Sequence, residues 1–306
     1  MTQVDAVLLI AFGGPTAPHE IRPFLEIVTR GRGIPPEHLE EVACHYERLP
    51  GGRSPLNDLT LAQARALERE LTVRGPALPV FVGMRNWCPF LHETLAVMTG
   101  RGVKRALGII LSPFRTDASW ERYQQDVAEA RAKVPGAPDV AYAPAWFDHP
   151  KFVEAVAERT RAALAELPPA ERAKTPLVFT AHSVPVAMAD ASPYVSDFTS
   201  AARAVATRLG HERWSLAYQS RSGSPRQPWL EPDIAAVLKR LGGEGERHAA
   251  VTPIGFACDH VELLYDLDIE ARARAERQGM TIHRAAAVND HPAFIAMLAD
   301  LVRASK

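Results

Sequence analysis

Short apolar runs of strand length alternate along the chain with longer amphipathic segments, and this alternation constrains the fold more than any other feature. Strands that alternate with helices of about ten or more residues form parallel sheets covered on both faces. The runs come in two sets of four, which predicts an α/β chain with two similar halves. They are Val4–Phe12, Pro79–Met84, Lys104–Ser112 and Asp139–Ala143, then Leu177–Ala181, Trp214–Tyr218, Ala249–Ile254 and Thr281–Ala285.

A domain boundary is expected after the fourth predicted strand. The segment APAWFDHP at residues 143–150 carries two prolines there. We therefore expect a first domain over residues 1–145 and a second over residues 146–289. Helical patterns such as Phe152–Leu167 fill the intervals between strands. The last one, Pro292–Arg303, follows the final strand, and its periodicity does not decide on which domain it packs.

Composition and charge exclude several classes of protein. The 306 residues are 47% hydrophobic and 23% charged, which is typical of a globular protein. The 35 Lys and Arg nearly cancel the 36 Asp and Glu, so no overall field favours nucleic acid. The apolar runs stop far short of the roughly 18 to 20 residues that span a bilayer. The N-terminal sequence MTQVDAVLLI lacks the cationic region of a secretory signal. We therefore expect a cytoplasmic protein with no transmembrane segment and no nucleic-acid partner.

The cysteines limit the metal chemistry that is open to the chain. Cys44, Cys88 and Cys258 lie far apart and show no CxxC spacing. They do not indicate a disulfide framework, and they are too few for a four-thiolate cluster. Any bound metal is therefore expected to have nitrogen and oxygen ligands.

Three loops in the first half are candidates for ligand binding. The first strand ends in AFGGPT, residues 11–16, where glycines permit a sharp turn, but the spacing is not that of a phosphate loop. The sequence RGRG at residues 30–33 offers planar guanidinium groups suited to a carboxylate, and a solvated basic loop explains it as well. The segment GGRSPLN, residues 51–57, precedes a long helical pattern, with Ser54 or Asn57 as a candidate cap.

In the second half, His182 ends the predicted strand of the sequence LVFTAHSVP. Ligands of doubly wound sheets bind at the carboxyl ends of strands, so this position favours a site residue about as much as a structural one.

The segment CDHVELLYDLDIE, residues 258–270, predicts a helix with a row of carboxylates on one face: Asp259, Glu262, Asp266 and Glu270. Stacked like charges are destabilising, so the row needs compensation by a hydrated cation or a proton relay. The alternative is an exposed acidic face near Arg272 and Arg274.

His182 and Glu262 follow strand ends of the same predicted half, so both can face one site. An imidazole and a carboxylate suit Fe(II), Zn(II) or Co(II), and they are equally suited to act as a general-base pair.

Seven motifs, in this order and spacing, resemble those of the ferrochelatases, which insert ferrous iron into a porphyrin in heme synthesis. The resemblance covers essentially the whole chain and rests on LLIAFGGP, RGRG, GGRSPLNDLT, VGMRNWCPF, AHSVP, YQSRSGSPRQPWLEPD and GFACDHVELLYDLDIEA. It implies two Rossmann-like, chelatase-type domains, each a parallel four-stranded sheet flanked by helices, around a porphyrin cleft. It also implies that a helix at residues 290–306 returns to the first domain.

The resemblance implies a lyase whose substrates are Fe(II) and a free-base porphyrin, either coproporphyrin III or protoporphyrin IX, and which releases two protons. It requires no prosthetic group. Members with an iron–sulfur cluster need four cysteines, so no cluster is expected here. Transient contact with neighbouring heme-pathway enzymes is compatible with this function.

Matched to the motifs of the family, the catalytic residues fall on His182 and Glu262, which are also expected metal ligands. Asp266 and Glu270 match its carboxylate line; they are also expected to bind metal, and the line would be a route for hydrated metal or departing protons. The expected porphyrin-binding residues are Phe12, Arg30, His45, Tyr46, Ser54 and Tyr123.

Two positions depart from the family pattern. Phe12 stands where some bacterial members have a tyrosine that ligates the product iron, so that role is absent. His45 stands where some members have an arginine, which weakens the expected propionate contact. Two alternative functions stay open. One is a chelatase that inserts cobalt or iron into another tetrapyrrole such as sirohydrochlorin, and the other is a non-catalytic heme or porphyrin carrier.

Overall fold

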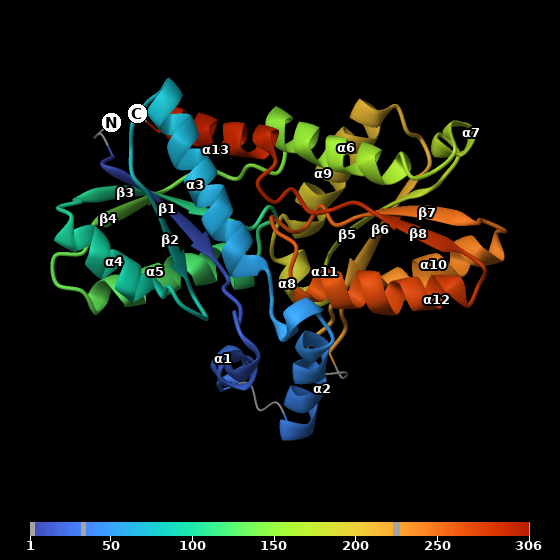
Figure 1. Cartoon of the computed structure of the whole chain (residues 1–306), viewed down its shortest axis with the longest axis horizontal. Helices are drawn as coiled ribbons and strands as arrows, with labels where there is room; N and C mark the ends of the chain where they lie inside the picture. The colour runs from blue at the N-terminus through green and yellow to red at the C-terminus, as the bar shows by residue number, and fades with distance from the viewer. Residues whose placement is uncertain (1–3, 32–34, 223–226, 306) are drawn as a thin grey trace. The chain divides into compact units, whose positions relative to one another are not determined.

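The computed structural model describes residues 4–31, 35–222 and 227–305 (Figure 1). The chain forms two compact units. Unit 1 comprises residues 1–112, 118–144 and 295–306, and unit 2 comprises residues 113–117 and 145–294. No sequence feature indicated that the short segment 113–117 belongs to unit 2.

Among the described residues, eight strands form two parallel four-stranded sheets, which confirms the predicted α/β fold class. The sheet of unit 1 has the order β2-β1-β3-β4, and that of unit 2 the equivalent order β6-β5-β7-β8. The strands are β1 (Ala6–Ala11), β2 (Val80–Met84), β3 (Arg105–Ile110), β4 (Asp139–Tyr142), β5 (Leu177–His182), β6 (Trp214–Gln219), β7 (His248–Thr252) and β8 (Thr281–Arg284).

Burial explains why these strands were visible in the sequence. β1 lies between β2 and β3, and all six of its residues are buried. β5 lies between β6 and β7 and is buried except at its last residue, His182. A strand buried on both faces must be apolar throughout, so it appears as a continuous hydrophobic run.

In unit 1 the helices cover both faces of the sheet (Figure 1). One face carries α3 (Leu56–Arg74) and α13 (Pro292–Ala304), and the other carries α4 (Leu91–Gly100) and α5 (Arg122–Ala132). Between β1 and α3 the described chain forms two α-helices, α1 (Ile21–Thr29) and α2 (Pro36–Glu47), and two short 3-10 helices, η1 (Pro18–Glu20) and η2 (Pro50–Gly52). A π-helical turn, η3 (Asp117–Glu121), leads into α5.

In unit 2, α6 (Pro150–Leu164) and α9 (Tyr194–Leu209) pack together over one face of the sheet. The other face carries α10 (Ile234–Gly243) and a continuous helical segment made of α11 (Val261–Tyr265), the π-helix η4 (Asp266–Ala271) and α12 (Arg272–Glu276). The side chain of Asp233 accepts a hydrogen bond from the backbone N–H of Ala236 and so caps α10. Two short helices, α7 (Pro169–Arg172) and α8 (Val186–Asp190), complete this unit.

One hydrophobic cluster of unit 2 lies between the sheet and the helical segment that contains η4. Val178 from β5, Leu238 from α10 and Leu263 from α11 are fully buried in one cluster with Ile282 of β8. The apolar side of this helical segment therefore points at the sheet, and its carboxylates point elsewhere. Within the described residues, no helix has the length and apolar character that crossing a membrane requires.

Candidate active site

His182 is the last residue of β5, and hydrogen bonds define its orientation. Its Nδ1 lies 2.5 Å from the carbonyl oxygen of Ser183. A carbonyl only accepts, so Nδ1 carries the proton and Nε2 of the neutral ring presents a lone pair. The hydroxyl of Tyr194 donates to the carbonyl oxygen of His182 at 2.7 Å. Burial raises the pKa of Tyr194, so its hydroxyl stays a donor.

Glu262 lies between two imidazoles. Its Oε1 is 3.7 Å from Nε2 of His182, and its Oε2 is 3.4 Å from Nε2 of His260. Burial works to raise the pKa of Glu262, but the charges of His182 and His260 and a hydrogen bond from His260 outweigh it and lower the pKa to about 2. Glu262 is therefore ionised at neutral pH.

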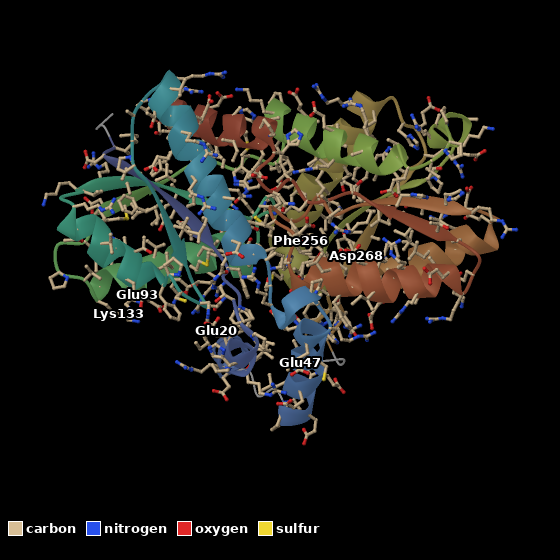
Figure 2. All side chains as sticks on the ribbon, in the orientation of Figure 1. Glu20, Glu47, Glu93, Lys133, Phe256 and Asp268 are labelled. Carbon is tan, nitrogen blue, oxygen red and sulfur yellow. The ribbon has the colours of Figure 1, made fainter. Side chains whose placement is uncertain are left out.

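His260 keeps Glu262 charged. Its Nδ1 lies 3.1 Å from the carbonyl oxygen of Cys258, so both of its ring nitrogens face acceptors. Burial lowers the pKa of His260, but the hydrogen bond and charge of Glu262 more than compensate and raise it. The ring of Phe256, on the loop before α11 (Figure 2), packs against His260 with 5.1 Å between centroids.

The carboxylates after Glu262 differ in their surroundings. Ser220 donates a short hydrogen bond to Oδ2 of Asp266. Burial, with the charges of Glu262 and Glu270, raises the pKa of Asp266 to about 7 despite that hydrogen bond. Glu270 is exposed and lies 3.9 Å from Nη2 of Arg274, so the predicted alternative of an exposed acidic face describes this end of the row.

The predicted regular α-helix is interrupted by the π-helix η4, which begins at Asp266. The carboxylates are spaced four residues apart. This spacing is longer than one turn of an α-helix, which has 3.6 residues, and shorter than one turn of a π-helix, whose hydrogen bonds run from residue i to i+5. The π segment thus offsets the drift of an α-helical row and brings Glu270 back toward the face that carries Glu262.

The expectation that Asp259 belongs to this row is wrong, because α11 begins only at Val261. Asp259 instead accepts hydrogen bonds from Arg284 Nη1 at 2.7 Å and from Asn289 Nδ2 at 2.8 Å. Arg284 also donates two hydrogen bonds to Asp268 of η4, which Figure 2 labels on that helical segment. One guanidinium therefore fixes the chain on both sides of Glu262.

In the described part of the chain, the side chains that could bind a metal ion come together at most in pairs. No group of three or more His, Cys, Asp or Glu side chains there is placed to hold a metal ion. His182 and Glu262 supply one nitrogen and one oxygen donor, a set suited to Fe(II). Further positions around such an ion would be filled by water or by the second substrate.

In unit 1, the turn after β1 is fixed by Asn57 of α3. Its Oδ1 accepts from the backbone N–H of Gly14 at 2.9 Å, and its Nδ2 donates to the carbonyl oxygen of Cys88 at 3.1 Å. Gly13 has a φ of +84°, and a Cβ there would lie 3.0 Å from the backbone nitrogen of Trp87. Only glycine fits this turn without strain. Asn57 thus joins the AFGGPT turn to the loop after β2.

Aromatic rings surround Phe24 at this end of the sheet. Its ring makes edge contacts with Phe12 at 6.4 Å, Tyr46 at 6.1 Å and Trp87 at 6.0 Å between centroids. Phe12 is 39% exposed, while Tyr46 is buried. The indole of Trp87 donates to Glu20, which lies at the start of α1 (Figure 2), at 2.9 Å. Two predicted porphyrin-binding residues therefore share one cluster.

Arg85 joins a third predicted residue to this cluster. Its guanidinium lies 5.8 Å from the ring centroid of Phe12 and 5.0 Å from that of Tyr123. Its Nε lies 2.8 Å from Oδ2 of Asp126. Burial raises the pKa of Asp126, although Arg85 and Arg122 lower it.

The other predicted porphyrin-binding residues belong to the segment between β1 and α3; they are Arg30, His45 and Ser54. Ser54 is buried, and its Oγ accepts from the backbone N–H of Leu56 at 3.3 Å. The cap position of α3 is occupied by Pro55, so the expectation that Ser54 or Asn57 caps this helix is wrong. His45 is half-buried in the last turn of α2, and Arg30 is exposed at the end of α1. Arg32 of the RGRG motif, and residues 223–226 of the YQSRSGSPRQPWLEPD motif, lie outside the described residues.

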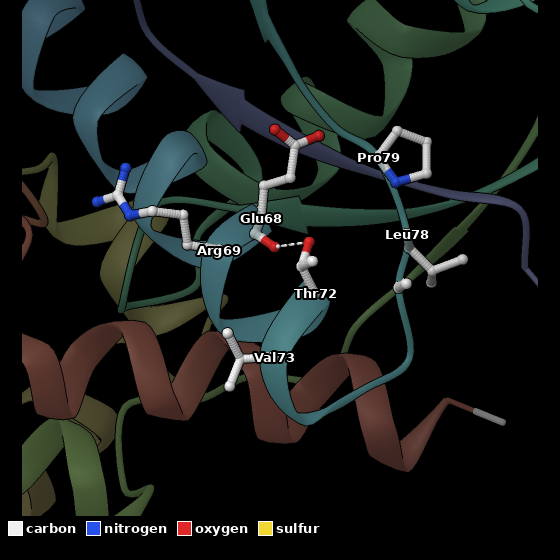
Figure 3. Close-up of a pocket in the computed structure, with 7 residues that line it drawn as sticks. Glu68, Arg69, Thr72, Val73, Leu78 and Pro79 are labelled. Carbon is white, nitrogen blue, oxygen red and sulfur yellow. Dashed lines mark hydrogen bonds between the residues drawn. The ribbon is translucent and has the colours of Figure 1, made fainter.

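One surface pocket of about 480 Å³ lies elsewhere in unit 1 (Figure 3). It is lined by the end of α3, including Arg69 and Val73, and by Leu78 and Pro79, which precede β2. Ligands of such sheets bind at the carboxyl ends of the strands, and this pocket lies at the amino end of β2. It is therefore not the site that His182 and Glu262 indicate.

The sequence reasoning missed three residues with defined roles in these sites, namely Arg85, His260 and Ser220. Arg85 follows β2 directly, so the strand-end rule that found His182 also applies to it. Ser220 follows β6 in the same way and has a φ of +60°, which is uncommon for a residue other than glycine. His260 stands two residues before Glu262 and carried no separate signal.

The fold is similar to that of solved chelatases. The structure titled "SirB from Bacillus subtilis with Fe3+" matches with a TM-score of 0.59 and 11% identity, over 99% of this chain and 95% of that chain. The sirohydrochlorin chelatase SirB from Bacillus subtilis subspecies spizizenii, in complex with cobalt, matches with a TM-score of 0.56 and 12% identity, over 99% and 94%. At such identities the likeness concerns the fold, which is that of an α/β chelatase.

Sequence similarity is more specific. The ferrochelatase family model matches residues 4–306. The chain is 43% identical over 302 residues to the coproporphyrin III ferrochelatase of Mycolicibacterium smegmatis, covering 97% of this chain and 88% of that one. It is 46% identical over 302 residues to the coproporphyrin III ferrochelatase of Mycobacterium avium, covering 97% and 87%.

The chain therefore belongs to the ferrochelatase family, as its motifs predicted. It is a porphyrin metal chelatase, a lyase that inserts iron into a porphyrin in heme biosynthesis. The alternative interpretations, a sirohydrochlorin chelatase and a non-catalytic carrier, are not favoured by these relatives.

Proposed function

We propose that the porphyrin substrate is coproporphyrin III. The observation that carries this proposal is the naming of similar relatives as coproporphyrin III ferrochelatases, at 43% identity in Mycolicibacterium smegmatis and 45% in Frankia alni. Coproporphyrin III carries four propionates and protoporphyrin IX carries two, so the two substrates differ most in the cationic and hydrogen-bonding groups that they require.

Unit 1 supplies the groups that bind the macrocycle in this proposal. Phe12 presents an exposed aromatic face, and Arg85 lies between its ring and that of Tyr123. Exposed Arg30 is suited to a propionate, because a guanidinium binds a carboxylate through two parallel hydrogen bonds. The remaining predicted contacts, His45, Tyr46 and Ser54, belong to the same unit.

Unit 2 supplies the groups that handle protons and metal. A free-base porphyrin holds two N–H protons where the metal must enter, so insertion requires that both leave. Nε2 of His182 takes a pyrrole proton, because its Nδ1 already donates to Ser183. The imidazolium that forms then faces ionised Glu262 across 3.7 Å, which stabilises the new charge. Nε2 and Oε1 hold Fe(II) only until the ion moves to the ring nitrogens, because a protonated Nε2 has no lone pair for a metal. The first proton then passes to the carboxylate row, which frees Nε2 to take the second pyrrole proton.

The carboxylates beyond Glu262 form an exit route in this proposal. Asp266 follows one helical turn later, and exposed Glu270 follows one turn after that. A proton or a hydrated cation thus meets acceptor oxygens at successive turns between the half-buried pair and solvent.

An anaerobic insertion assay tests the substrate. The purified chain is offered Fe(II) with either coproporphyrin III or protoporphyrin IX, and kcat/KM is measured for each. Charge-assisted contacts to the extra propionates predict a preference for coproporphyrin III on the order of tenfold or more. Equal values, or a preference for protoporphyrin IX, would contradict the proposal.

The role of His182 is tested with His182→Ala. Loss of a general base predicts a decrease in turnover of about 100-fold or more, while binding of the porphyrin, followed by its fluorescence, is retained. His38→Ala, at an exposed histidine of α2, is the control and retains full turnover. Substantial turnover by His182→Ala would remove this residue from the mechanism.

The chain needs no prosthetic group for this chemistry, and iron enters as substrate. The three cysteines are fewer than the four thiolates of an iron–sulfur cluster. Acid-labile sulfide in the isolated protein, in proportion to its concentration, would overturn this part of the proposal. Cytoplasmic location and transient contact with neighbouring heme-pathway enzymes stay predictions, to be tested by fractionation and cross-linking in cells.

A further inference from the structure

A second pair of imidazoles lies in unit 2, far from His182. His248 is the first residue of β7, and His283 lies in β8, whose register places it beside Ala250. Residues two apart share one face of a strand, so both histidines project from the same face. The strand register separates this pair from the carboxyl end of β5 by roughly 20 Å along the strands.

The two rings approach closely. Nδ1 of His248 lies 3.1 Å from Nε2 of His283, and the ring centroids are 5.3 Å apart. The side chain of His283 is only 9% exposed, so its ring has few alternative positions.

Glu166 orients His283 from the other side. Its Oε2 lies 2.8 Å from Nδ1 of His283. Arg172 donates to the carbonyl oxygens of Ala165 at 3.1 Å and of Leu167 at 3.0 Å, one on each side of Glu166. The backbone at Glu166 is therefore fixed even though its side chain is 62% exposed.

The contact with Glu166 determines which nitrogen of neutral His283 carries a lone pair. A carboxylate accepts, so Nδ1 of neutral His283 carries the proton and its Nε2 presents a lone pair to His248. With the Nε2–H tautomer of His248, its Nδ1 presents a second lone pair on the side that faces His283. Two nitrogens bound to one metal ion at about 2.05 Å with a tetrahedral angle lie about 3.3 Å apart, close to the separation found here.

We propose that His248 and His283 form a second metal site, which binds a divalent ion of the borderline class such as Zn²⁺ or Cu²⁺. Imidazole nitrogen is a preferred donor for these ions, and a carboxylate that accepts from the other ring nitrogen is the usual support of a metal-bound histidine. Glu166 has that supporting position. Two protein ligands leave the other coordination positions of the ion to water.

Metal counting tests the site directly. The full-length chain is freed of metal with a chelator and dialysed against Zn²⁺, and bound zinc per chain is compared with that of His283→Gln and His248→Gln. Each variant is expected to bind one equivalent fewer than the wild type. The matched control is His291→Gln, which removes a histidine from another pair with a carboxylate, Glu158 at 3.0 Å, and is expected to bind the wild-type amount.

Two further measurements separate a metal site from a hydrogen-bonded pair. Glu166→Gln is expected to bind zinc with the full stoichiometry but about tenfold more weakly or worse. Cu²⁺ bound to the wild type is expected to show nitrogen hyperfine coupling in its EPR spectrum, and part of that coupling is lost in His248→Gln. If His283→Gln does not fold, the zinc stoichiometry and the EPR spectrum of His248→Gln still test the site.

Insertion of Fe(II) into porphyrin is expected to be retained in all three variants, because none of these residues belongs to the His182 site. Failure of the proposed porphyrin chemistry and failure of the second metal site are thus observed in different assays. Equal zinc stoichiometry in the wild type, His283→Gln and His248→Gln would overturn the proposal and leave the pair as a hydrogen bond between strands.

Discussion

At the residue scale, the two carboxylate oxygens of Glu262 face imidazoles with different roles: Oε1 faces His182 and Oε2 faces His260. His260 has both ring nitrogens directed at acceptors, so its position favours the imidazolium form. His182 has one nitrogen directed at a carbonyl oxygen and the other at Glu262. The contact of His182 with Glu262, at 3.7 Å, is longer than a hydrogen bond, whereas His260 lies 3.4 Å from the carboxylate and donates a hydrogen bond to it. In the proposed mechanism, His260 keeps the carboxylate charged and His182 accepts the proton.

Glu262→Gln tests that division. The amide is nearly isosteric, but it cannot hold a negative charge beside His182 or His260. Turnover in the anaerobic assay is expected to decrease by about 100-fold, while the far-UV circular dichroism spectrum stays that of the wild type. Glu244→Gln, an exposed residue paired with Arg240 in α10, is the matched control with unchanged turnover. An unchanged rate for Glu262→Gln would leave the carboxylate row with a structural role only.

At the element scale, the helical segment that carries Glu262 is held from outside itself. Asp268 of η4 and Asp259 of the preceding loop both bind Arg284, which ends β8. The side chain of Arg284 is 12% exposed and those of its partners are 26% and 14% exposed. Burial works to lower the pKa of Arg284, but both aspartates more than compensate and raise it.

Arg284→Met is expected to decrease the free energy of unfolding by about 3 kcal/mol, because it leaves two largely buried carboxylates without their cation. The loss is measured by urea denaturation. Arg272→Met removes a cation that lies 4.0 Å from the same Asp268 but is 42% exposed. That control is expected to cost less than about 1 kcal/mol. Similar losses for both variants would show that burial does not decide the contribution of Arg284.

At the scale of the whole molecule, the sequence predicted the sheets more completely than the sites. The central strands β1 and β5 were visible because residues such as Leu8 and Val178 are fully buried and must be apolar. His182 was found because the end of a parallel strand is a position that the fold itself defines. Both inferences need only local sequence and a general rule of architecture.

The errors concern partners that are distant in sequence. Asp259 was placed on a helix by its spacing, but Arg284 and Asn289, 25 and 30 positions later, bind it outside the helix. The role of Arg85 depends on Tyr123 and Asp126, which η3 and α5 bring back to it. The His248–His283 pair depends on the register of β7 and β8. Periodicity contains no information on such contacts.

Asp266 contributes to the pH dependence of global stability. Its pKa is about 7 in the folded chain against an ordinary value of 3.8, because burial disfavours its charge. Between these values the folded state keeps a proton that the unfolded state has lost, so the free energy of unfolding decreases as pH rises from about 4 to about 7. At about 1.4 kcal/mol per pH unit, the loss is at most about 4 kcal/mol. Glu262, with its pKa lowered to about 2, contributes stability that is lost only as pH falls below about 4.5.

Asp266→Asn removes the ionisation and keeps an acceptor for Ser220. The variant is expected to be more stable than the wild type at pH 8 and nearly equal to it at pH 4.5, because the wild-type side chain is ionised in the folded chain only at the higher pH. The measurement is the urea midpoint of the metal-free chain at both pH values. Asp290→Asn, at an exposed position, is the control and shows the same difference from wild type at both. A difference for Asp266→Asn that is independent of pH would show that Asp266 is already ionised at low pH, and that burial does not hold its proton.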